Sequence, residues 1–169
     1  MISTVLFSLQ QAAMAALKAD PIYDGTLSAN KQSIPIVTES KGSIVQDIEL
    51  ALAKVGICAL VLTPSIELHA PNTQDVSGFA KLNVGLYEDA PINQGNGGTG
   101  IQIAQLAEAT VMILHWLQHG CYTAGVAGES TAATRFLALP SPIEFQSPGP
   151  PLRYNVAFQA HVTLNPQYS

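Results

Sequence analysis

The feature that most constrains the fold is an alternating stretch near the end of the chain, residues 152–164. In an extended chain its apolar side chains lie on one side, and its polar or charged side chains lie on the other. The apolar set consists of Tyr154, Val156, Phe158, Ala160, Val162 and Leu164. A similar stretch at 135–145 is joined to it through the turn formers QSPGPP, so the sequence predicts a closing β-hairpin.

Two further stretches have the spacing of amphipathic helices. The first covers about residues 2–17 and ends near the Asp20-Pro21 pair. The second begins at a Ser-x-x-Gln capping box, Ser43 and Gln46, and ends at a glycine, Gly56. Both patterns place apolar residues on one face, so each helix is expected to pack against a sheet.

The longest helix is predicted from about Thr99 to His119, with Gly120 as its stop. Four apolar residues in a row, residues 111–114, make it apolar nearly all round. Such a helix is sandwiched between other elements or lies at an interface.

Three more strands complete the pattern. Residues 34–39 are expected to form a strand, and Pro35 indicates an edge strand or a strand start. Residues 57–62 are expected to form a buried strand that 66–70 extends after a bend, and residues 80–88 a half-buried strand. The order α-β-α-β-β-α-β-β predicts one α+β domain over residues 1–169. It has three helices and a mainly antiparallel or mixed sheet of about five strands.

The charge content of the chain favours some classes of function and argues against others. Only 11% of the residues are charged, well below the quarter or so of an ordinary soluble domain. This composition is typical of a subunit that buries much of its surface against copies of itself or other partners, although a monomer with an uncharged polar surface stays open. The net charge of -5, with seven Lys and Arg, argues against direct nucleic-acid binding.

The cysteines and the apolar runs bear on location. Cys58 and Cys121 have neither metal-knuckle nor disulfide spacing, which suits a reducing cytoplasm. The first twenty residues lack the basic start of a signal peptide, and a pair of glutamines interrupts their apolar stretch. No apolar run reaches the roughly 18 residues of a membrane span.

The stretch GNGGTG, residues 95–100, has the glycine spacing of a dinucleotide-binding fingerprint. That fingerprint must follow a strand directly, whereas about six residues intervene here, and the Lys-Ser/Thr pair of a P-loop is absent. We therefore expect a pliable loop that contacts a protein neighbour. Its candidate contact residues are Asn93, Gln94, Gly95, Asn96, Gly97, Gly98 and Thr99.

Nothing else in the sequence requires an enzyme. His115 and His119 are four apart on the expected helix but lack a third metal ligand, so helix-end histidines are the simpler interpretation. Ser130 does not lie in a nucleophile elbow. The acidic pairs, Asp47 with Glu49 and Glu88 with Asp89, fit capping or solvated positions as well as catalysis. We expect no catalytic residue, cofactor or metal.

The layout resembles bacteriophage tail terminator, or tail-completion, proteins. The resemblance lies in the opening helix ending in LKADPIYDG, the helix SIVQDIELALAKVG before ICALVLTP, and the strand, glycine loop, long helix and closing hairpin. The segment LNVGLYEDAPINQGNGGTGIQIAQLAEA also resembles small phage and prophage tail and neck proteins. The resemblance spans most of the chain and rests on element order, without a short diagnostic motif.

The resemblance implies a virion protein, made in the host bacterial cytoplasm, that forms a homo-oligomeric ring of commonly six copies on the tail tube. Such a ring contacts the tail tube protein and the head-tail connector, and it stops tube polymerisation. It implies no membrane, no sequence-specific nucleic acid and no catalytic residues. Two alternatives stay open: another neck or baseplate adaptor, and a small nucleotide- or phosphate-binding enzyme that uses the Gly95–Gly100 loop.

Overall fold

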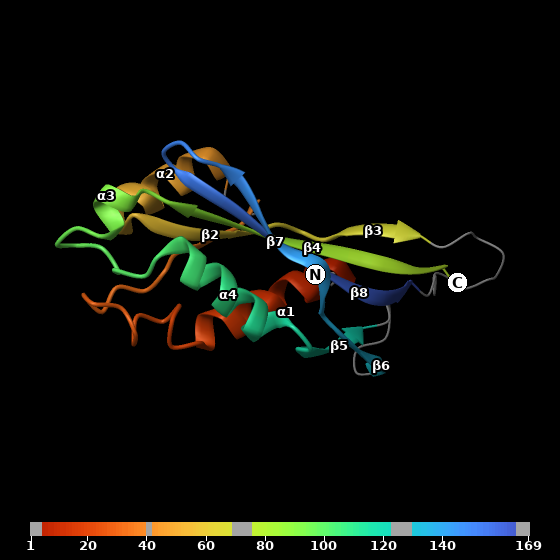
Figure 1. The fold of residues 1–169 in the computed structure, drawn as a ribbon. Coiled ribbons are helices and arrows are strands. Elements are labelled where there is room, and N and C mark those ends of the chain that lie inside the picture. The colour runs from red at the N-terminus through yellow and green to blue at the C-terminus, as the bar shows by residue number, and fades with distance from the viewer. Residues whose placement is uncertain (1–4, 40–41, 69–75, 123–129, 165–169) are drawn as a thin grey trace.

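The computed structural model describes residues 5–39, 42–68, 76–122 and 130–164. It shows an α+β fold in which helices pack on both faces of a mixed sheet (Figure 1). The helices are α1 (Val5–Ala19), α2 (Ile44–Val55), α3 (Ala90–Asn93) and α4 (Ile103–Leu114). The strands are β1 (Ile36–Val37), β2 (Ile57–Val61), β3 (Ser65–Leu68), β4 (Val76–Glu88), β5 (Gln118–Tyr122), β6 (Ser130–Arg135), β7 (Leu137–Ser147) and β8 (Leu152–Leu164).

The central ribbon of the sheet is the antiparallel pair β4 and β8. Its register runs from Val76 opposite Leu164 to Glu88 opposite Leu152. The strand order is β1-β2-β4-β8-β7, with β3 paired to β4 beside β2. Only β1 pairs in parallel, so the sheet is mixed, and the predicted closing hairpin and α+β class are confirmed.

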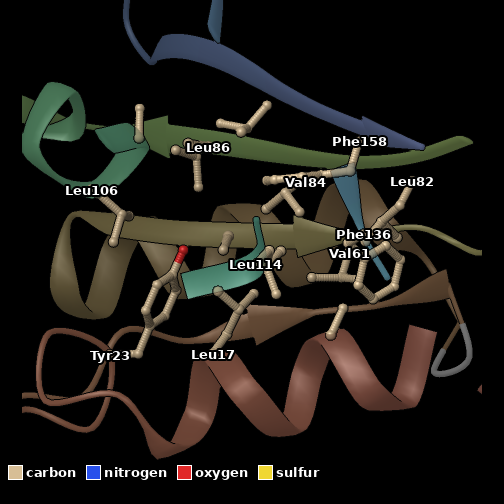
Figure 2. Close-up of a cluster of buried hydrophobic side chains, with 14 of the residues drawn as sticks. Leu17, Tyr23, Val61, Leu82, Val84, Leu86, Leu106, Leu114, Phe136 and Phe158 are labelled. Carbon is tan, nitrogen blue, oxygen red and sulfur yellow. The ribbon is translucent and has the colours of Figure 1, made fainter. Parts of the chain in front are cut away.

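The alternation in β8 sets which side of the ribbon is buried. Val156, Phe158, Ala160 and Val162 are at most 1% exposed, and they lie beside the buried Leu82, Val84 and Leu86 of β4. Helices α1 and α4 cover this face, as Figure 2 shows for Leu17, Leu106 and Leu114. Burial of these side chains at roughly 25 cal/mol per Å² is the main stabilising contribution.

Helix α2 lies on the opposite face of the sheet (Figure 1). Its N-cap is Ser43, whose hydroxyl oxygen accepts a hydrogen bond from the N–H of Gln46 at 3.4 Å. Its C-cap is Gly56, with φ 80°, and the Gly56 N–H donates to the Leu52 carbonyl at 2.8 Å. The sequence assignment of this helix is therefore confirmed at both ends.

The predicted helix over 99–119 is too long. Helix α4 ends at Leu114, and Gly120, the expected stop, lies in β5. Trp116 adopts a left-handed φ of 66°, and its N–H donates to the Phe136 carbonyl at 2.6 Å, while the Phe136 N–H donates to Leu117 at 3.1 Å. Pairing with a segment twenty residues away thus ends the helix, which local periodicity cannot reveal.

The element count also differs from the sequence prediction. Strands β5 and β6, an antiparallel pair outside the main sheet, were not predicted from the sequence. The short helix α3 adds a fourth helix between the strand that ends at Glu88 and the glycines. Strand β3 matches the expected extension after a bend, although residues 69 and 70 lie outside the described residues, as do residues 2–4 of the first helix.

Candidate functional site

The glycine loop joins α3 to α4 at the end of the sheet where β4 finishes. Asn93, the last residue of α3, is fully buried beneath it. The side-chain Nδ2 of Asn93 donates to Glu88 Oε1 at 2.6 Å and to the Ile101 carbonyl at 2.7 Å. Its Oδ1 accepts from both the N–H and the hydroxyl of Thr99, at 3.2 and 2.6 Å. The side-chain amide of Asn93 thus hydrogen-bonds Glu88 before the loop and both Thr99 and Ile101 after its tip.

Two glycines make room for Asn93. A Cβ on Gly56, at the end of α2, or on Gly98, in the loop, would collide with the Asn93 backbone. A Cβ on Gly97 would have no heavy atom within 4 Å. Gly56 and Gly98 are therefore required for close packing, whereas Gly97 lies in open space.

The backbone donors that a phosphate would need are already used. Every N–H from residue 98 to residue 103 donates within the chain. The acceptors, in sequence order, are Gly95 O, Asn93 Oδ1, Asn93 O, Thr99 Oγ1, Gln105 Oε1 and Glu88 Oε2. A phosphate-binding loop presents such groups to its ligand instead.

The carboxylate of Glu88 occupies the place where an anion binds a helix. Its Oε2 accepts from the N–H of Ile103, the first residue of α4, at 3.0 Å. Its Oε1 accepts from Asn93 and, at 3.1 Å, from Gln94 Nε2. Glu88 is only 3% exposed, so the positive end of the α4 dipole is balanced by a buried carboxylate of the chain itself. In the sequence, Glu88 stands out only as half of an acidic pair with Asp89.

The seven candidate contact residues divide into two groups. Asn93, Gly98 and Thr99 are buried and belong to the hydrogen-bonded interior of the loop. The other four are exposed: Gln94, Gly95, Asn96 and Gly97. A partner could reach only the exposed group, so the contact prediction narrows to residues 94–97. Because hydrogen bonds hold both ends of the loop, its backbone is less free to move than its glycine content suggested.

The other candidates for chemistry are not brought together. His115 caps the C-terminal end of α4, where its Nδ1 accepts from the Ala138 N–H at 3.0 Å, and His119 lies in β5 instead of on the same helix. Ser130 is the first residue of β6. His161 packs edge-on against Phe79 at 5.7 Å between ring centres. His69 lies outside the described residues.

Metal-binding residues do not gather within the described part of the chain. In residues 5–39, 42–68, 76–122 and 130–164, no three His, Cys, Asp or Glu side chains form a group that could hold a metal ion. Cys58 is fully buried under α2, and burial raises the pKa of its thiol to about 12. The thiol is therefore protonated at neutral pH and is a poor nucleophile.

The C-terminal end of α4 presents apolar side chains to solvent. Met112 is 80% exposed and Trp116 is 57% exposed. The Arg135 guanidinium lies 4.7 Å from the centre of the Trp116 ring, and its Nη1 lies 3.4 Å from the Trp116 carbonyl oxygen. We call Met112, Trp116 and Arg135 the helix-end patch. Trp, Arg and Met are residue types enriched in protein interfaces.

Other large apolar side chains are exposed elsewhere in the described residues. They include Phe7, Leu27, Val45, Leu50, Leu62, Leu68, Ile92 and Phe145. Of the helices described, none is both long and apolar enough to cross a bilayer. The sequence matches no protein-family model and no curated protein.

Proposed function

We propose that this chain is a structural assembly protein of a bacteriophage or prophage tail, a terminator that forms a ring at the head-proximal end of the tail tube. One face of the ring matches the last tube ring. The other denies the next tube subunit a template and offers a docking site to the head-tail connector. The mechanism is geometric and needs no reacting group.

The observation that carries this proposal is the helix-end patch. An exposed Trp stacked by an Arg, with an 80% exposed Met in the last turn of the preceding helix, has the composition of an interaction hot spot. The chain also has few charges with which to cover such side chains, at 11% charged residues. These features fit a subunit whose surface is completed by neighbours, and the sequence resemblance described above names the kind of assembly.

The phosphate-binding alternative is weaker than the sequence spacing suggested. A phosphate on the glycine loop would have to displace the Glu88 carboxylate from the N-terminus of α4, because both are anions competing for the same donors. It would also have to break the contacts between Asn93 and Thr99. A neck or baseplate adaptor would also bind its neighbours through exposed apolar side chains, as a terminator does. The deletion experiment described next distinguishes the two.

The decisive experiment is deletion of the gene from its phage or prophage, followed by electron microscopy of the particles. A terminator predicts overlong tails without heads, because the tube keeps polymerising. Tails of normal length with a defect at the neck or baseplate would instead indicate an adaptor. Unchanged, infectious particles would contradict both.

A solution experiment tests the oligomer directly. Light scattering of the purified chain, alone and mixed with tail tube protein, should show a ring-sized species that contains several copies. The variant Trp116→Ala should reduce that species, whereas Val45→Ala, on the opposite face of the sheet, is the matched control for an exposed apolar residue. A chain that stays monomeric at high concentration and does not bind tube ends would contradict the proposal.

A further inference from the structure

The tip of the glycine loop carries the one Asn-Gly pair in the sequence, Asn96-Gly97. Both residues are exposed. They occupy the two central positions of a turn that is closed by the Gly98 N–H donating to the Gly95 carbonyl at 3.2 Å. The pair lies between the anchored ends of the loop, in the part that Asn93 does not hold.

Nothing among the described residues restrains the two groups that could react. The Asn96 side chain and the Gly97 N–H make no hydrogen bond within the described chain. A Cβ added to Gly97 would meet no heavy atom within 4 Å, so no other described part of the chain packs against this side of the glycine. Glycine also gives the turn the backbone freedom to bring that nitrogen toward the side chain before it.

We propose that Asn96 is a site of spontaneous deamidation. The backbone nitrogen of Gly97 attacks Cγ of Asn96, a C–N bond forms, and the side-chain amide leaves as ammonia, with the proton of the Gly97 nitrogen passing through solvent. The resulting succinimide is opened by one water molecule at either carbonyl. The products are aspartate and isoaspartate, and no oxidant or reductant is needed.

A second pair of the same kind, Asp24-Gly25, provides an internal contrast. Hydrogen bonding from the Thr26 side chain, and from the Thr26 N–H to Asp24 Oδ1 at 2.7 Å, lowers the pKa of the Asp24 carboxyl and holds it against its own turn. Gly25 is buried, with φ 95°, close to the backbone of residues 31–33. Folding thus protects one pair and leaves the other open.

The modification would alter the loop surface without unfolding the loop. Asn93 holds Glu88, Thr99 and Ile101 on either side, and none of these contacts involves Asn96. Deamidation adds one negative charge to the turn, and isoaspartate adds a methylene to the main chain. If residues 94–97 contact a partner, as the sequence leads us to expect, the aged loop binds that partner less well. The chemistry itself depends neither on that contact nor on the proposed function.

The test is an ageing series on the full chain in mildly alkaline buffer, read by peptide mass spectrometry and by an enzymatic assay for isoaspartate. We expect Asn96 to convert before Asn30, Asn83 or Asn155, to a mixture of both products. A urea-unfolded sample is the reference. Folding should leave the Asn96 rate close to that of the unfolded chain and should slow isomerisation at Asp24 by about tenfold, because the turn there is rigid.

Two variants keep the result interpretable. Gly97→Ala should slow deamidation about tenfold, because a Cβ hinders attack by the nitrogen while the open position tolerates the methyl group. Asn96→Asp reproduces the charge and should keep the melting temperature of the parent. Conversion of Asn96 no faster than that of Asn30 in the folded chain, or an unchanged rate in Gly97→Ala, would overturn the proposal. Loss of assembly with no change at Asn96 would bear on the proposed function alone.

Discussion

The backbone hydrogen-bonding groups at the two ends of α4 are paired in different ways. At the N-terminal end, the buried Glu88 carboxylate accepts from the first N–H of α4, and the buried Asn93 amide donates to Glu88 and to the Ile101 carbonyl. At the C-terminal end, the backbone of Trp116 pairs with the backbone of Phe136, so the Trp116 side chain is not needed for capping and lies in solvent.

This difference separates architecture from binding. Where buried polar groups satisfy one another completely, the residues hold the fold and have little left for a ligand. Where main-chain pairing between Trp116 and Phe136 closes the turn, the Trp116 side chain remains available to a partner. The glycine-rich N-terminal end of α4 resembles a binding site in sequence, but its contacts stabilise the fold. The helix-end patch has no binding motif in its sequence, but its side chains are exposed to a partner. The predictions below test that division.

The largest effect is expected for Asn93→Ala. Its amide makes four hydrogen bonds in a site with no exposure, and its removal leaves buried groups of Thr99 and Ile101 without partners. The free energy of unfolding, measured by urea denaturation, should fall by about 4 kcal/mol. Asn96→Ala, three residues along in the exposed turn, should change it by less than about 0.5 kcal/mol. Equal effects would show that the loop is not a structural joint.

A smaller loss is expected when the glycines of the same loop are compared. Gly98→Ala forces a methyl group against the Asn93 backbone, so the free energy of unfolding should fall by about 3 kcal/mol. Gly97→Ala has open space and should be near neutral or slightly stabilising, by at most about 1 kcal/mol. Thermal denaturation of the pair measures this. If the two variants have the same melting temperature, Gly98 does not lie against the Asn93 backbone.

At the other end of α4, Trp116→Ala should act on association and not on folding. Self-association or binding to tube ends should weaken by about 2 kcal/mol, roughly 30-fold in dissociation constant. The unfolding free energy should change by less than about 0.5 kcal/mol, since the side chain is 57% exposed. Sedimentation and urea denaturation on one sample separate the two. A large stability loss with unchanged association would reverse the roles of the two ends.

The smallest effect is expected in the middle of α4, where Tyr23 donates to the Thr110 hydroxyl at 2.6 Å while that hydroxyl donates to Leu106. Tyr23→Phe should lower the free energy of unfolding by about 1 kcal/mol. Burial, together with the negative charge of Asp20, raises the pKa of Tyr23 above its ordinary value, with the Thr110 hydrogen bond opposing the shift.

That raised pKa sets the pH dependence of the tyrosine contribution. The folded protein holds the phenol proton more tightly than the unfolded chain does. The contribution is therefore complete below about pH 10, the ordinary tyrosine value, and is lost as pH rises above it. Urea denaturation from neutral to strongly alkaline pH should show a shallower decline in Tyr23→Phe. Parallel declines in both proteins would place the titration elsewhere, for example at Tyr87, whose pKa burial also raises.

Most of the fold could be predicted because its signals are local. The alternation of 152–164, the capping box at Ser43 and the stop at Gly56 each describe contacts within a few residues, and the structure contains all three. The end of α4 and the β5–β6 pair could not be predicted, since both depend on pairing with residues near Phe136. Apolar periodicity continues past Leu114, so nothing local marks the true end.

The site was predicted only in part, for the same reason. The sequence drew attention to residues 93–99 as a contact loop, although Asn93 ends α3, and the failed fingerprint context argued against a nucleotide. It could not identify Asn93 as the hub, because the partners of its amide come from β4, the loop and the start of α4 together. A buried Asn between two glycines is visible only after folding, when Gly56 and Gly98 meet it.

By itself the sequence determined the α+β class, the buried face of β8 and the low charge content, because periodicity and composition act through neighbouring residues and through the solvent. The tertiary structure alone decided which glycines pack and which are free, where α4 stops, and which polar groups face one another. Those outcomes depend on distances between residues far apart in the chain. In GNGGTG, Gly98 and Thr99 pack against and hydrogen-bond the buried Asn93, whereas Asn96-Gly97 is the exposed part that is open to chemistry.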